Sequence, residues 1–177
     1  MKDPELIYIA PTAEFPSNTL PVVLYGNALR LPPILPGRYV KLVFKNHGWS
    51  NAWNSGIYTF HHYHSITHEV LGFIKGTTTL ILGGEEGRQI TVHKGDVLII
   101  PAGVAHKNLE YEHQVACIGA YPDGHDYDIN TGQPGERPAA DRNITSVPLP
   151  TRDPLYGPHE GICRLWQMLE PAYSITK

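Results

Sequence analysis

The segment 56–76 carries four histidines and one glutamate between two glycines. It is rich in β-branched and aromatic residues, which indicates a strand, a turn and a second strand. Successive side chains of a strand point to opposite faces, so His62 and His64 share one face. Two imidazoles side by side, with the carboxylate of Glu69 five residues further on, can converge on a single cation.

A further candidate ligand, His106, follows the largely apolar stretch 95–105. Neutral imidazole and carboxylate are both available near pH 7, and three of the former with one of the latter suit a divalent transition metal. Iron, manganese, nickel, zinc, cobalt and copper all accept such ligands, so the sequence predicts one divalent ion without fixing which. Four protein ligands on a six-coordinate ion leave two positions for water, dioxygen or a chelating substrate.

The order and spacing of these residues resemble the two motifs of the cupin family. The matching residues are Gly56, His62, His64, Glu69 and Gly76 for the first motif, and Gly95, Pro101, Gly103 and His106 for the second. The asparagine that often closes the second motif is displaced, because Asn108 follows His106 after only one residue.

Five further stretches are similar to the YjlB-type cupins, a group of small single-domain proteins. These stretches are residues 15–22, 56–64, 100–107, 119–122 and 153–157. The resemblance implies a cupin jelly roll, and it implies that His62, His64, Glu69 and His106 are the metal ligands. It does not imply a particular reaction.

Two other ligand arrangements are compatible with the histidine cluster. His64 and His68 would share a face if this segment were a zinc-protease helix, but Tyr63 and the residues after it are poor helix formers and the glutamate of that motif is absent. A register slip of one residue would turn His61 and Tyr63 inward instead, against the spacing to Glu69.

The same alternation predicts which side chains surround the metal. Tyr58 and Phe60 share the face of His62, and Leu71 and Phe73 share the face of Glu69, so these four residues are expected to wall an apolar pocket or to fill the barrel core. On the next strand, sequence leaves open whether Val97 and Ile99 or Leu98 and Ile100 point inward. Glu69 or His68 is the candidate group for moving a proton, with a solvent-facing turn as the alternative for His68.

The pattern of short strands and turns predicts an all-β fold. Strands are expected at 58–64, 69–74, 77–82, 88–93, 97–100, 107–111 and 114–120, with no room between them for crossover helices. Antiparallel strands of this kind close as a barrel or double-sheet jelly roll. One short helix is expected at 38–47, where the apolar residues have helical spacing and Gly48 can end the helix.

A length of 177 residues suits one domain, here 1–177. We expect an N-terminal arm and helix at 1–55, a barrel core with both motifs at 56–121, and a proline-rich wrap at 122–177. The apolar runs 6–9 and 22–25, flanked by prolines, are expected as edge strands, and the run 162–166 as a returning strand.

Composition narrows the function. A net charge of −3 does not suggest a basic surface for binding nucleic acid. No apolar run is long enough to cross a membrane, and no signal peptide is evident, so a cytoplasmic protein is expected. The partner expected is a small organic molecule, and the apolar arms could pair a homodimer. The function expected is a metal-dependent, dioxygenase-like enzyme; a metal-assisted isomerase or lyase, a ligand-binding sensor module and a metal-stabilised scaffold are the alternatives.

Overall fold

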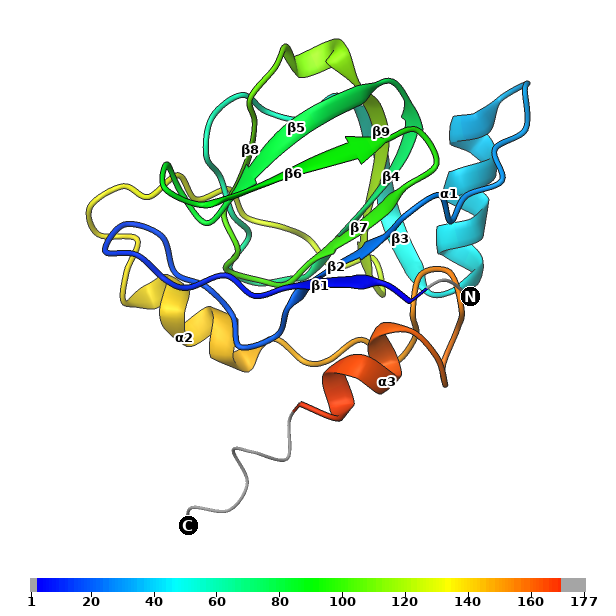
Figure 1. The fold of residues 1–177 in the computed structure, drawn as a ribbon. Helices are drawn as coiled ribbons and strands as arrows, with labels where there is room; N and C mark the ends of the chain where they lie inside the picture. The colour runs from blue at the N-terminus through cyan, green and yellow to red at the C-terminus, as the bar shows by residue number, and fades with distance from the viewer. Residues whose placement is uncertain (1–2, 170–177) are drawn as a thin grey trace.

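The computed structural model describes residues 3–169 and places nine strands in two antiparallel sheets within this range (Figure 1). The larger sheet has the strand order β1-β2-β7-β4-β9-β3, and the smaller has the order β6-β5-β8. The strands are β1 (Glu5–Ile7), β2 (Val22–Tyr25), β3 (Trp49–Ser55), β4 (Glu69–Lys75), β5 (Thr77–Leu82), β6 (Arg88–His93), β7 (Val97–Ile100), β8 (His106–Asn108) and β9 (Ala116–Pro122). The prediction of an all-β double-sheet jelly roll is confirmed.

The space between the two sheets holds the main apolar core. Alternate residues of β4 and β7, among them Leu71 and Leu98, point inward and meet Leu80 and Leu82 from β5. This resolves the alternative that the sequence left open for β7, since Leu98 and Ile100 face the interior of the barrel.

The outer face of the larger sheet is covered by helices. The helix α1 (Pro36–Asn46) packs Val40 and Phe44 against this face, and both side chains are fully buried. The helix begins at a proline, whose fixed φ suits a first turn, and it ends just before Gly48, which has a φ of +80°. The predicted helix is therefore confirmed, with its start two residues earlier than expected.

Several elements differ from the prediction. The segment 58–64 is extended but is not a continuous strand, and its ladder pairing consists of two isolated bridges, His62 with His106 and Tyr63 with Asn130. The strand β3 was not expected, since a register shift between Ser50 and Trp53 breaks the alternation of its side chains.

Cys117 on β9 and Cys163 are both buried free thiols.

The run predicted as a returning strand is the helix α3 (Ile162–Gln167). Ile162, Cys163 and Trp166 are its buried residues, and a helix of six residues is too short to reveal its period in the sequence. The proline-rich segment also contains α2 (Ala139–Ser146), which was not predicted, and a short 3-10 turn η1 (Glu112–Gln114) precedes β9. Among residues 3–169, no helix has both the length and the apolar character that crossing a lipid bilayer requires.

Candidate metal centre

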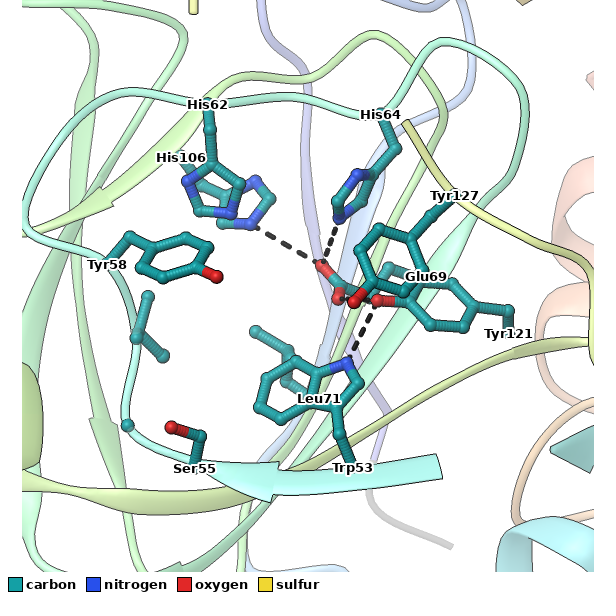
Figure 2. Close-up of a pocket in the computed structure, with 12 residues that line it drawn as sticks. Trp53, Ser55, Tyr58, His62, His64, Glu69, Leu71, His106, Tyr121 and Tyr127 are labelled. Atoms are coloured by element: carbon teal, nitrogen blue, oxygen red, sulfur yellow. Dashed lines mark hydrogen bonds and ion pairs between the residues drawn. The ribbon is translucent and has the colours of Figure 1, made fainter. Parts of the chain in front are cut away.

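Three histidines turn their rings toward one point inside the barrel (Figure 2). His62 and His64 come from the extended segment before β4, and His106 is the first residue of β8. One ligand nitrogen from each ring lies within 4.8 Å of the others, and all three side chains are buried. The ring centroids of His62 and His106 are 4.1 Å apart.

Backbone carbonyls fix the orientation of each ring. The Nδ1 of His62 lies 3.3 Å from the carbonyl oxygen of Phe60, and the Nδ1 of His106 lies 3.2 Å from that of Val104. The Nδ1 of His64 makes the equivalent bond to the carbonyl of Asp128. A carbonyl oxygen can only accept, so each Nδ1 carries a hydrogen, and in the neutral form of the ring Nε2 keeps the lone pair that faces the centre.

Glu69 completes the group from the first position of β4. Its Oε2 lies 3.5 Å from Nε2 of His64 and 3.4 Å from Nε2 of His106. Glu69 is only 2% exposed, and its Oε2 has no hydrogen-bond partner among the described residues. A buried carboxylate oxygen without a donor is costly unless a cation balances it, so this atom fits the place of a metal ligand.

The electrostatics of the group follow from burial and from these neighbours. Burial and the nearby His106 lower the pKa of His62 to about 3, which keeps this ring neutral at physiological pH. Burial raises the pKa of the Glu69 carboxyl, but the rings of His64 and His106 outweigh this and hold it well below its usual range. Burial lowers the pKa of His64, but the negative charge of Glu69 raises it overall.

A cavity of about 180 Å³ opens beside the four groups (Figure 2). Its lining is mainly aromatic and aliphatic beyond the four polar groups, and among the described residues no lysine or arginine lines it. The lining residues are Trp53, Ser55, Gly56, Ile57, Tyr58, His62, His64, Glu69, Leu71, His106, Tyr121 and Tyr127. A cavity of this kind has the size and lining of a small-molecule site, with its polar groups gathered on one wall.

The structure brings together the four predicted ligands but separates some of the other predicted site residues. Tyr58 and Leu71 line the cavity, whereas Phe73 is buried in the barrel core and Phe60 is half-exposed and stacks on Tyr58. His68 stands just before β4, and its side chain points to the outer side of the sheet, where it lines a different cavity. It therefore does not face the candidate metal centre and was wrongly predicted as a proton carrier there.

Alternative positions for the neighbouring side chains are also settled. Tyr63 points away from the centre and packs with Phe15 and Ala140, and the ring of His61 lies against Phe15 rather than in the centre. The inward face is therefore that of His62 and His64. No described helix contains His64 and His68, so the zinc-protease arrangement is absent from residues 3–169.

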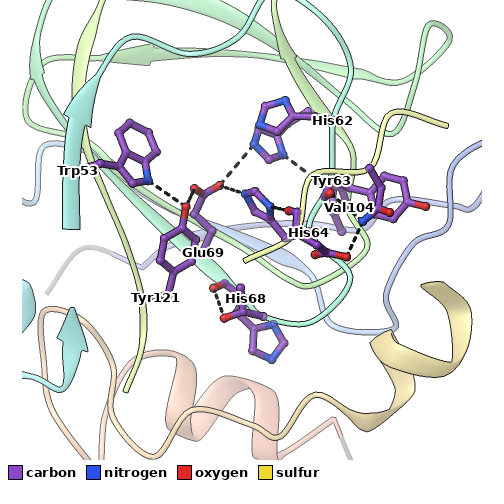
Figure 3. Close-up of polar contacts among 12 residues, drawn as sticks. Trp53, His62, Tyr63, His64, His68, Glu69, Val104 and Tyr121 are labelled. Atoms are coloured by element: carbon purple, nitrogen blue, oxygen red, sulfur yellow. Dashed lines mark hydrogen bonds and ion pairs between the residues drawn. The ribbon is translucent and has the colours of Figure 1, made fainter. Parts of the chain in front are cut away.

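Sequence reasoning missed three aromatic residues of the site. Tyr121 on β9 donates a hydrogen bond of 3.1 Å to Oε1 of Glu69, and Trp53 on β3 donates one of 2.9 Å to the Tyr121 hydroxyl (Figure 3). Tyr127 stacks on Tyr121 at 4.7 Å. Burial and the charge of Glu69 raise the pKa of Tyr121 far above its ordinary value, so its hydroxyl keeps the proton that it donates.

A curated relative decides the family. The uncharacterized protein YjlB of Bacillus subtilis (strain 168) is 40% identical over 146 residues, which is 82% of this chain and 86% of the relative. The chain belongs to the YjlB family. This confirms the resemblance to YjlB-type cupins, and the jelly roll is the cupin fold. No family model matches the chain.

Solved structures with a similar fold are more distant from this YjlB-family chain. An acireductone dioxygenase from Bacillus anthracis, with a cadmium ion in its active centre, is 17% identical with a TM-score of 0.43, covering 60% of this chain and 82% of its own. A DUF861 family protein from Thermotoga maritima is 22% identical with a TM-score of 0.34, covering 56% and 96%. Oxalate decarboxylase of Bacillus subtilis, which has Mn(II) centres, is 18% identical with a TM-score of 0.35, covering 63% and 27%.

Proposed function

We propose that His62, His64, His106 and Glu69 bind one divalent transition metal. The observation that carries this proposal is the buried Oε2 of Glu69, which lacks a donor and lies beside imidazole nitrogens whose lone pairs face it. Three nitrogens and one oxygen suit iron, manganese, nickel, cobalt, copper or zinc. The single carboxylate leaves part of the charge of the ion uncompensated, which favours Lewis acidity.

We propose further that this centre serves a small metal-dependent enzyme with dioxygenase-like or other redox chemistry. A bound ion would supply polarisation or electron transfer to a chelating substrate. The residues of the chain then have three tasks: the ligands fix the ion, Tyr58 and Trp53 wall the cavity, and the apolar lining excludes bulk water.

The lining also limits the class of substrate. With no cationic side chain among the described lining residues, phosphorylated or dicarboxylate substrates would lack a partner for their second charge. A compact molecule that chelates through a carbonyl, an enolate, a catecholate or a thiolate fits better. The cavity volume of about 180 Å³ restricts the substrate to a small molecule.

The metal content of purified protein tests the first part of the proposal. We expect close to one equivalent of divalent metal per chain for the wild type, measured by plasma emission after loading and desalting. The variant Glu69→Ala combined with His62→Ala is expected to lose it, because two of the four ligands are absent. His125→Ala, which removes an exposed histidine outside the group, is the matched control and should retain the metal.

Oxygen uptake tests the enzymatic part with the same proteins. Iron-, manganese- and nickel-loaded wild type should consume dioxygen with at least one member of a panel of catechols, flavonols, diketones and thiol acids. The double variant should not. A tight ligand in a thermal-shift screen with no turnover would instead favour a binding module.

A further inference from the structure

The two oxygens of the Glu69 carboxylate have different environments. Oε1 accepts the hydrogen bond from Tyr121, while Oε2 faces the histidines. The pairing of Val70 with Ala120 sets β4 beside β9, so Glu69 and Tyr121 lie on the same inner face of adjacent strands. The contact is therefore built into the sheet register and does not depend on a loop.

Trp53 gives this contact a fixed direction (Figure 3). An indole N–H can only donate, so the bond from Trp53 occupies the Tyr121 oxygen as an acceptor. The hydroxyl hydrogen is then left to point at Oε1 of Glu69, the acceptor 3.1 Å away. The chain of donors runs one way, from Trp53 through Tyr121 to the carboxylate.

We propose that Tyr121 is a positioning residue that occupies Oε1 of Glu69 and thereby restricts this ligand to a single oxygen, with Trp53 fixing the direction of the hydroxyl. This inference rests on the proposed metal site. A carboxylate freed of this bond could bind through both oxygens and fill a coordination position that a substrate would otherwise use. Tyr121 thus keeps a position open without touching the ion itself.

The test uses Co²⁺, whose visible absorption reports coordination number, and the variant Tyr121→Phe. We expect about tenfold weaker Co²⁺ binding, the lower end of the effect of removing a partner of a metal ligand. We also expect the visible spectrum of the bound ion to shift, since a second carboxylate oxygen takes the position that water or a substrate would otherwise fill. A loss of packing alone would not change the spectrum of the ion that remains bound.

Two further variants separate the hydrogen bond from the aromatic ring. Tyr127→Phe removes a hydroxyl from the stacked neighbour in the same cavity, which has no hydrogen bond to Glu69, and should leave affinity and spectrum unchanged. Trp53→Phe leaves Tyr121 in place but removes its donor, and should shift the spectrum in the same direction by a smaller amount. This second variant also serves if Tyr121→Phe folds poorly.

The outcomes distinguish this inference from the proposed function. A wild type that binds no Co²⁺ would overturn both. Tight binding by the wild type with an unchanged spectrum and affinity in Tyr121→Phe would overturn the positioning role alone. Equal changes in Tyr121→Phe and Tyr127→Phe would also overturn it, because the ring environment and not the hydrogen bond would then be responsible.

Discussion

His68 and Glu69 are consecutive residues with opposite surroundings. Glu69 points into the barrel, while the ring of His68 packs on Trp166 at 5.0 Å on the outer side of the sheet. The side chain is only 1% exposed, and its Nδ1 accepts a hydrogen bond of 3.0 Å from the backbone N–H of Ala102. The ring is therefore neutral, with its hydrogen on Nε2.

This buried ring should make metal-free protein sensitive to acid. Burial lowers the pKa of His68 to about 4, whereas a histidine in the unfolded chain titrates near 6.5. As the pH falls below 6.5 the unfolded state takes up a proton that the folded state does not, so stability declines until about pH 4. The full effect is about 3 kcal/mol.

The variant His68→Asn tests this, because asparagine can still accept the hydrogen bond from Ala102 but does not titrate. Urea unfolding in the presence of a chelator at pH 7, 5.5 and 4.5 should show a shallower decline in the free energy of unfolding than for the wild type. Parallel curves for the two proteins would contradict the assignment.

For single residues, the spacing of the sequence motifs alone identified the side chains that meet at the centre, since two motifs with a fixed number of residues between their members specify them. It could not place His68, because burial on the outer face depends on the helix α3, which the sequence did not indicate. It also missed Tyr121 and Trp53, because their roles come from the pairing of β3, β4 and β9.

At the scale of elements, the indole of Trp53 on β3 covers a position of β9 that has room only for glycine. The register pairs Trp53 with Gly119, and a Cβ at Gly119 would lie 2.1 Å from the indole ring. The ring of Trp53 lies over this bare position and from there donates to Tyr121.

Gly119→Ala should therefore displace the indole and destabilise the sheet by about 1–3 kcal/mol, the usual range for overpacking. The measurement is the free energy of unfolding in urea, with the fluorescence of the folded state as a second readout of the tryptophan environment. Gly26→Ala is the control, since a Cβ there has no atom within 4 Å and should change stability by less than about 0.5 kcal/mol. Equal stabilities for the two variants would refute the close approach.

Strands with regular alternation or long apolar runs, such as β5, β6 and β7, were predicted to the residue. The exceptions have physical reasons. The strand β3 carries Asn51 at a φ of +55° and a bulge, so its pattern is not that of a strand. The helices α2 and α3 have eight and six residues, too few for a clear period.

At the scale of the whole molecule, the segment after β9 takes part in the site as well as in the fold. The carbonyl of Asp128 orients His64, and its carboxylate accepts hydrogen bonds from the backbone N–H and the hydroxyl of Ser65. Further along, the fully buried Asp153 accepts a bond of 2.7 Å from the Tyr25 hydroxyl and one of 2.9 Å from the backbone N–H of Ile162. Asp153 thus fastens α3 to β2.

Asp153→Asn should lower the free energy of unfolding by about 2–3 kcal/mol. The amide carries no charge to strengthen these hydrogen bonds, and its NH2 group would face groups that are themselves donors. Thermal and urea unfolding measure the loss. Asp126→Asn, an exposed position in the same segment, should leave stability unchanged. Metal stoichiometry should be the same in both folded variants, and a loss of metal in Asp153→Asn alone would show that the wrap is coupled to the centre.

The three imidazoles are oriented by main-chain carbonyls, whereas the carboxylate is oriented by the hydroxyl of another side chain. Substitution of the residues around the histidines leaves those carbonyls in place, so the orientation of each ring does not depend on which side chains surround it. The acid lacks this protection, since one substitution at position 121 removes its restraint. Divergence in metal preference among proteins that share this backbone should therefore track position 121 more closely than the surroundings of any histidine.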